Sequence, residues 1–184
     1  MNAYATISSK AAGIIMDGGE IQQLEKGADL FLAKRFNGFE YFQLKGISHR
    51  FNIDQQMHPV TTGIYQHETV ITPHFARTPN GQSLFSLQAL TDCVFLKIPA
   101  GLFRELSDRN TEIRMFGRAV VEKEFMSSLR FEELFRSQSA KDRLLFFREN
   151  YPNLENLIPH TTIASFLGIT PVSLSRLRHE LARE

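Results

Sequence analysis

The sequence is poor in the residues that covalent or metal-based scaffolds require. Its 184 residues include one cysteine, Cys93, and no tryptophan. A single cysteine cannot form a disulfide within the chain, and it cannot supply the several thiolates that a cysteine-ligated zinc ion or an iron–sulfur cluster needs. The composition therefore excludes a disulfide scaffold and is typical of a reducing, cytoplasmic compartment.

The chain also lacks long hydrophobic runs and a strong excess of charge of either sign. No stretch approaches the roughly 20 apolar residues of a membrane span, and the N-terminus has no basic segment followed by an apolar one. Lysine and arginine number 21 against 20 acidic residues, for a formal net charge of +1. We therefore expect a soluble cytoplasmic protein without a membrane partner, in which only a local basic face could bind nucleic acid.

The first half of the chain has the pattern of successive antiparallel strands. Apolar and polar residues alternate over 47–53, 84–89 and 93–98. Turn sequences such as Asn37-Gly38 and Pro79-Asn80-Gly81 separate the alternating segments. This pattern predicts an antiparallel barrel, sandwich or jelly roll.

Residues 107–136 contain no proline and only one glycine, which predicts a single long helix. Ile113, Phe116 and Val120 follow one another at helical spacing, and further aromatic residues widen the apolar stripe. We expect this helix to contact both its own domain and a second copy, and we assign Ile113, Phe116 and Val120 to dimerisation. An ordinary buried helix of a monomer is the alternative.

The tail predicts a pair of short helices over 159–167 and 171–182. Two helices that cross steeply need a small residue where their backbones approach, which Ala164 supplies. They also need a residue that tolerates positive φ at the turn, which Gly168 supplies. Thr170 is a suitable N-cap for the second helix. The spacing therefore predicts a helix-turn-helix.

The exposed face of the second helix predicts contacts with DNA, because its leucines turn inward toward the first helix. An arginine can bind a guanine edge through two hydrogen bonds, and a valine can pack on a thymine methyl. We assign base readout to Arg176, Ser173, Ser175 and Val172. Hydroxyls and an imidazole suit phosphates, and we assign phosphate contacts to Thr161, Thr162 and His179. An amphipathic helical hairpin with a solvated arginine is the alternative.

These features together resemble the Crp-Fnr superfamily of bacterial transcription regulators. The resemblance is carried mainly by Ile169-Thr170-Pro171-Val172-Ser173-Leu174-Ser175-Arg176, and less specifically by Lys26-Gly27 through Lys45-Gly46. It implies an α+β fold with three parts. These are a cyclic-nucleotide-binding-like sensor β-roll (1–106), a dimerisation helix (107–136) and a helix-turn-helix domain (137–184).

The resemblance also implies partners. A homodimer would place one recognition helix in each half-site of an inverted-repeat operator, and RNA polymerase is a further candidate partner. Pro171 and Val172 stand where the family often has an Arg-Glu pair, so the half-site should differ from the best-known one. The chain ends shortly after Leu181, and we therefore expect no C-terminal wing.

Family members that bind cyclic nucleotides use a glutamate for the ribose and an arginine about ten residues later for the cyclic phosphate. Between Glu68 and Asp92 the sequence has no acidic residue, its only basic residue is Arg77, and the expected arginine position falls near Ser83. We therefore expect neither cyclic AMP nor cyclic GMP as effector. Whether another effector exists stays open.

The sequence gives only weak indications of a metal site or of a pocket for an apolar ligand. His58, His67 and His74 have no tight metal-ligand spacing, so we interpret them as surface or turn residues and expect no metal or cofactor. Four phenylalanines of the strand-rich part could pack the core or line an apolar pocket: Phe75, Phe85, Phe95 and Phe103.

Nucleotide-binding and hydrolase motifs are absent, so we expect no enzyme. The alternative function is a ligand- or protein-binding sensor module that no longer reads DNA.

Overall fold

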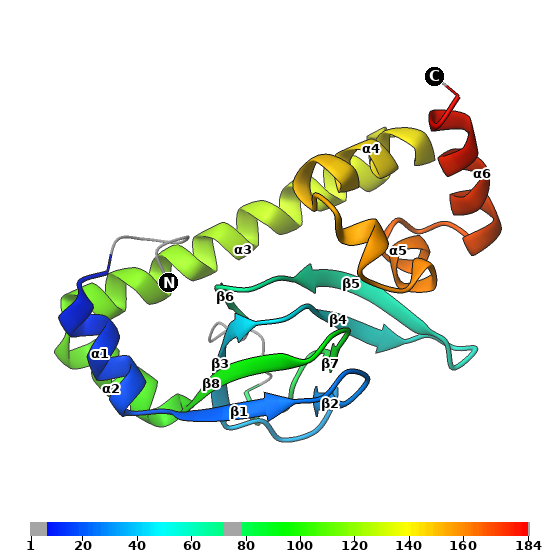
Figure 1. Cartoon of the computed structure of the whole chain (residues 1–184). Helices are drawn as coiled ribbons and strands as arrows, with labels where there is room; N and C mark the ends of the chain where they lie inside the picture. Colours follow the sequence, from blue (N-terminus) through cyan, green and yellow to red (C-terminus); the bar gives the residue numbers. More distant parts are fainter. Residues whose placement is uncertain (1–6, 72–78, 184) are drawn as a thin grey trace.

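Two four-stranded antiparallel sheets form the first part of the protein, in the computed structural model that describes residues 7–71 and 79–183 (Figure 1). The first sheet has the order β1-β8-β3-β6 and the second β2-β7-β4-β5. The strands are β1 (Glu20–Leu24), β2 (Asp29–Phe31), β3 (Phe39–Lys45), β4 (Ser48–Ile53), β5 (Pro59–Tyr65), β6 (Thr69–Val70), β7 (Ser86–Ala89) and β8 (Cys93–Pro99). The predicted antiparallel roll is confirmed.

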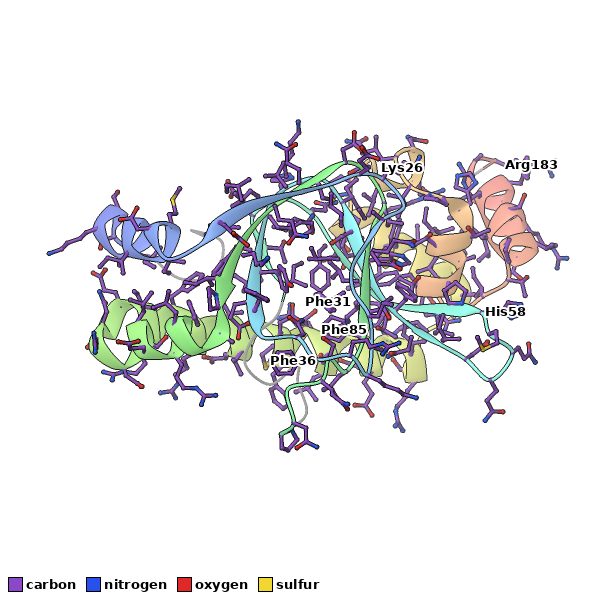
Figure 2. All side chains as sticks on the ribbon, turned by 90° about the horizontal axis from the view of Figure 1, so that it is seen from below. Lys26, Phe31, Phe36, His58, Phe85 and Arg183 are labelled. Atoms are coloured by element: carbon purple, nitrogen blue, oxygen red, sulfur yellow. The ribbon has the colours of Figure 1, made fainter. Side chains whose placement is uncertain are left out.

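The two sheets enclose an aromatic core because alternate residues of each strand point inward. Leu87 of β7 and Phe95 of β8 are completely buried there. The rings of Phe31 and Phe85 lie 5.7 Å apart (Figure 2). Between β3 and β4, Gly46 adopts a φ of +91°, and a side chain there would collide with the backbone of Asp92. This turn therefore depends on glycine.

Three helices cover one end of the roll: α1 (Ser9–Asp17), α2 (Ala100–Arg109) and α3 (Thr111–Ser137). The sequence predicts one helix from residue 107, but the structure ends α2 before Asn110 and begins α3 after it. Asn110 has extended backbone angles, and its side chain accepts hydrogen bonds from the backbone N–H groups of Glu112 and Ile113. Asn110 is thus an N-cap, and the predicted boundary at 106/107 falls inside α2.

The three residues assigned to dimerisation lie in the core of their own subunit. Ile113, Phe116 and Val120 are at most 2% exposed. They pack in one cluster with α1, α2 and the first sheet, where Phe116 stacks on Phe42 with ring centroids 6.2 Å apart. The assignment is therefore wrong for these side chains, because no second copy can reach them. Their helical spacing reflects the face that α3 turns toward the roll.

The C-terminal part consists of α4 (Ala140–Asn150), the short 3-10 helix η1 (Leu154–Asn156), α5 (His160–Phe166) and α6 (Pro171–Leu181). Ser139 caps α4, in a reciprocal arrangement with Asp142. These helices share one buried cluster with residues at the edge of the roll, among them Ile64. In the part of the chain that the structure describes, no helix is long and apolar enough to cross a membrane.

Helix α5 is joined to β5 by direct hydrogen bonds as well as by the shared core. The backbone N–H of Thr61 donates to Ser165 Oγ at 2.9 Å, and Ser165 Oγ donates to the carbonyl of Pro59 at 3.2 Å. The helices at the C-terminal end are therefore seated on the roll, close to the β4–β5 hairpin (Figure 1).

Replacing Val120 by aspartate tests the burial of the inner face of α3. An unpaired carboxylate at this 2% exposed position should lower the free energy of unfolding by about 3 kcal/mol or more, measured by urea denaturation. The matched control is Arg118→Asp at an exposed position of the same helix, for which we expect a change of about 0.5 kcal/mol or less. Equal stability of the two variants would contradict this packing.

Candidate nucleic-acid interface

The turn between α5 and α6 has the conformation that the sequence predicts. Gly168 adopts a φ of +64°, and the N–H of Ile169 donates to the carbonyl of Ala164 at 3.0 Å. Thr170 caps α6, with its Oγ1 accepting from the backbone N–H of Ser173 at 3.1 Å. Pro171 occupies the first helical turn. The two helices therefore form a helix-turn-helix in which backbone groups at the end of α5 and at the beginning of α6 are hydrogen-bonded.

Packing fixes the two helices against each other. Ala164 and Ile163 of α5 are completely buried, and Leu174 of α6 is 1% exposed. Phe135, near the end of α3, covers the turn, so that a Cβ on Gly168 would lie 2.7 Å from its ring. Glycine is therefore required at the turn both for its backbone angle and for the approach of this ring.

The face of α6 opposite this core points to solvent. Val172 is 69% exposed, and Ser175, Arg176 and His179 are also exposed. Arg176 has no hydrogen-bond or ion-pair partner in residues 7–71 and 79–183, so its guanidinium is available to a ligand. The structure thus brings four of the predicted contact residues onto one accessible helix face.

The other three predicted residues differ in their surroundings. Ser173 is half-buried, and its Oγ lies 2.9 Å from Thr170 Oγ1, so it belongs to the cap of the helix. Thr161 is exposed and Thr162 half-buried, both in the first turn of α5. Base readout by Ser173 would therefore require its hydroxyl to exchange this partner.

An ion-pair cluster that the sequence did not indicate braces the helix-turn-helix. Glu155 of η1 accepts from Arg148 of α4 at 2.6 Å and lies 3.2 Å from Nε of Arg178 in α6. Arg178 also lies 3.0 Å from the ring of His160 at the beginning of α5. The only sequence signal was a second arginine two positions after Arg176, on the other side of α6. This cluster joins all four C-terminal helical segments.

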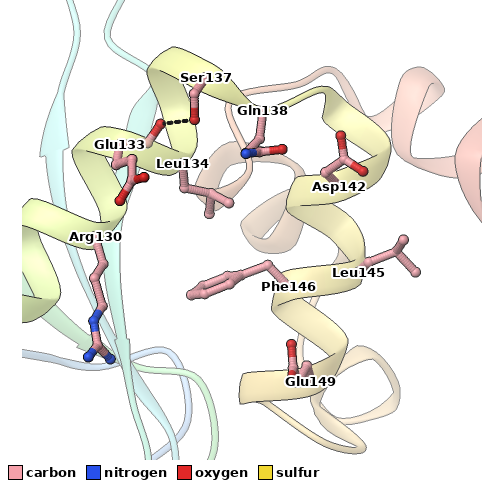
Figure 3. A pocket seen from close by; sticks show the side chains of 9 residues that line it. All are labelled: Arg130, Glu133, Leu134, Ser137, Gln138, Asp142, Leu145, Phe146 and Glu149. Carbon is pink, nitrogen blue, oxygen red and sulfur yellow. Dashed lines mark hydrogen bonds between the residues drawn. The ribbon is translucent and has the colours of Figure 1, made fainter.

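The junction between α3 and α4 is acidic and lies outside the predicted contact face (Figure 3). Ser137 Oγ donates to the carbonyl of Glu133 at 2.8 Å at the end of α3. A groove of about 420 Å³ between the two helices has Glu133, Asp142 and Glu149 on its walls against one arginine, Arg130. Such a charge balance repels phosphate, so the candidate interface is confined to α5 and α6.

Residues considered for an effector or metal lie in ordinary structural positions. Phe85 and Phe95 belong to the core of the roll, and Phe103 to the core beneath α3. His58 lies exposed at the tip of the β4–β5 hairpin (Figure 2), and His67 is also exposed. His74 and Phe75 lie outside the described residues. No group of three or more potential metal ligands occurs among the residues that are described.

The lone cysteine is buried beside the β3–β4 turn. Cys93 Sγ donates to the carbonyl of Ile47 at 3.3 Å, and burial raises the pKa of its thiol. Cys93 is therefore a structural residue of the roll rather than a reactive thiolate.

Comparison with known proteins identifies the fold. No protein-family model matches the sequence, and neither does any curated protein sequence. Among solved structures, the c-di-GMP responsive global regulator CLP of Xanthomonas campestris superimposes with a TM-score of 0.78 at 12% identity, over 96% of this chain and 92% of that chain. FixK2 from Bradyrhizobium japonicum gives 0.77 at 12% identity, over 90% and 85%.

A third solved structure carries the family description. It is a protein from Eubacterium rectale assigned to the Crp/Fnr family of transcriptional regulators, with a TM-score of 0.74 at 16% identity, over 96% of this chain and 85% of that chain. The similarity in all three cases spans both the roll and the C-terminal helices. The chain therefore has the fold of the Crp/Fnr transcription regulators, a cyclic-nucleotide-binding-like β-roll followed by a helix-turn-helix.

Proposed function

We propose that the protein is a sequence-specific DNA-binding transcription regulator of the Crp/Fnr type that acts as a homodimer. The observation that carries this proposal is the solvent-facing side of α6, where Arg176 has no partner within the described chain and Val172, Ser175 and His179 lie beside it. CLP is described as a global regulator and the E. rectale protein as a transcriptional regulator, which supports the same function for this chain.

In this proposal α6 enters the major groove with its N-terminal part toward the bases. Arg176 takes a guanine edge through two hydrogen bonds, and the exposed methyl groups of Val172 pack on a thymine methyl. Ser175 contacts a neighbouring base, and Ser173 contributes if its hydroxyl leaves Thr170. The half-site is therefore read by few direct contacts, which favours a short recognition sequence.

Phosphate contacts position the helix without reading sequence. We assign them to Thr161 and Thr162 in the first turn of α5 and to His179 on α6. Arg178 lies next to these residues and adds positive charge at the same edge, although Glu155 offsets part of it. Together these groups account for binding by a protein whose net charge is only +1.

The outer face of α3 is the proposed dimer interface. Phe125 is 60% exposed and Leu129, one turn further, is 44% exposed. Phe125 lies five positions after Val120, which places it about 140° around the helix from the buried face. Two copies of α3 packed along this face would remove these side chains from water. A parallel pair would also present two copies of α6 to one operator.

The sensor roll offers no cation at the position expected for a cyclic phosphate. Ser83 is 3% exposed, and its Oγ accepts from Asn37 Nδ2 at 3.1 Å. At this position the chain offers a cyclic phosphate a hydroxyl that is already engaged, in place of the guanidinium that would neutralise its charge. We therefore propose a regulator whose effector, if it has one, is neither cyclic AMP nor cyclic GMP.

Replacing Arg176 by alanine tests the assignment of base readout. We expect the binding free energy for an operator to weaken by about 1 to 3 kcal/mol, with relaxed discrimination at one base pair in each half-site, because one bidentate contact is lost. Fluorescence anisotropy titrations with operator and scrambled duplexes measure both effects. The control is Arg114→Ala on α3, which should leave both affinities unchanged. Unchanged operator affinity of the Arg176 variant would refute the assignment.

Replacing Phe125 by aspartate tests the proposed dimer interface. A charge at the centre of the apolar face should convert dimer to monomer in analytical ultracentrifugation and weaken operator binding at the same time. Circular dichroism should be unchanged, because Phe125 is exposed in the subunit. Met16→Asp, at a 53% exposed methionine of α1, is the matched control and should stay dimeric. A Phe125 variant that remains dimeric would contradict this interface.

A further inference from the structure

A cleft of about 440 Å³ lies where the roll, α3 and the helix-turn-helix meet. Its walls come from all three parts of the chain. The roll contributes Arg50 and the end of β5, α3 contributes its middle turns from Lys123 to Phe131, and the C-terminal helices contribute Tyr151 and Phe166. A cavity of this size and at such a junction is a common place for a small ligand.

Arg50 is held rigidly at this cleft. Its Nε donates to the carbonyl of Thr62 at 3.0 Å, and its Nη1 donates to the hydroxyl of Tyr65 at 3.2 Å. Its guanidinium also lies 5.9 Å from the ring centre of Tyr65 and 5.7 Å from that of Phe85. A Cβ on Gly63 would come 2.6 Å from Arg50 Nε, so glycine makes room for the side chain on β5. The guanidinium is therefore preorganised.

The acidic partner of Arg50 is a weak one. Glu124 Oε2 lies 3.4 Å from Arg50 Nη1, near the limit for a hydrogen bond, and Arg50 Nη2 has no hydrogen-bond partner in residues 7–71 and 79–183. Burial raises the pKa of Glu124 even beside this arginine. Because this contact is weak and leaves part of the guanidinium unused, Arg50 can pair with a second carboxylate beside Glu124.

The remainder of the cleft combines three aromatic side chains, Phe131, Tyr151 and Phe166, with polar and charged ones that include His67, Glu68 and Lys123. The rings of Phe131 and Phe166 lie 4.7 Å apart. Burial and the nearby Glu124 raise the pKa of Tyr151, which keeps its phenol neutral. Serine hydroxyls and an amide at the mouth, from Ser127, Ser128 and Asn150, can pair with a polar substituent. This lining suits a flat ring that carries one negative charge.

We propose that this cleft binds a small aromatic carboxylate, with the carboxylate on the guanidinium of Arg50 and the ring against Tyr151 and Phe131. The bound molecule would touch the roll, α3 and the C-terminal helices at once. The inference concerns binding alone and does not rest on the proposed DNA-binding function.

The test uses 4-fluorobenzoate as the probe and the full chain without DNA. Titration followed by ¹⁹F NMR should show saturable binding, and the uncharged 4-fluorobenzamide should bind at least about tenfold more weakly because it cannot pair with a guanidinium as an anion. Arg50→Gln should lower the affinity for 4-fluorobenzoate by a similar factor. Arg118→Gln, at an exposed arginine outside the cleft, should leave it unchanged.

A second variant keeps the test valid if Arg50→Gln fails to fold. Ser127→Trp leaves Arg50 in place and fills the cleft, so it should abolish binding, whereas Ser137→Trp at the end of the same helix should not. The proposal is overturned if 4-fluorobenzoate shows no saturable binding, if the amide binds equally well, or if Ser127→Trp binds as the wild type does. Because no DNA is present, each of these outcomes is independent of whether α6 reads an operator.

Discussion

The long helix α3 must bury apolar side chains against two different bodies, and the rest of the structure depends on this requirement. Its first turns place Phe116 in the core beside the roll, and its last turns place Phe131 and Phe135 against the helix-turn-helix. The helix has 27 residues and rises about 1.5 Å per residue. Because it is packed at both ends, its length fixes the distance between the roll and the helix-turn-helix. The direction in which α6 faces solvent follows from this packing.

A second connection reinforces the first. Ser165 of α5 is hydrogen-bonded to both Thr61 and Pro59 of β5, and the core of the helix-turn-helix includes Ile64 of the roll. The helices are therefore attached to the roll through a polar contact and a shared apolar cluster, in addition to α3. Because the turn at Gly168 is tightly packed against Phe135, α5 and α6 are held together as one unit on the roll.

Local signals in the sequence predicted the elements well. The cap at Thr170, the glycine turn at Gly168 and the alternation of residues 93–98 each act over a few residues, so their physical cause is visible in the sequence. Periodicity also predicted an apolar stripe on residues 113–120 of the long helix. It could not show whether this stripe meets the protein's own roll or a second copy, because both surroundings favour the same residues. The dimerisation assignment was wrong for this reason.

The missed features depend on contacts between residues far apart in the chain. The break at Asn110 was overlooked because asparagine is tolerated within helices and acts as a cap only when the chain turns there. Arg50 meets Glu124, 74 positions away, and no local pattern links them. The ion pairs of Glu155 with Arg148 and Arg178 likewise become visible only when α4, η1 and α6 are folded together. The fold class and the exposed face of α6 were thus more accessible from sequence than the environment of each side chain.

The most direct test of the account is selection from a random DNA library with the purified full chain at near-physiological salt. A dimer that presents two copies of α6 should enrich an inverted repeat whose half-site centres lie about 10 base pairs apart, one helical turn of DNA. Affinity for the enriched sequence should fall steeply with salt, as expected when phosphates are contacted. Failure to enrich any sequence, or an affinity for all duplexes that does not depend on sequence, would contradict the claim that α6 is a recognition helix.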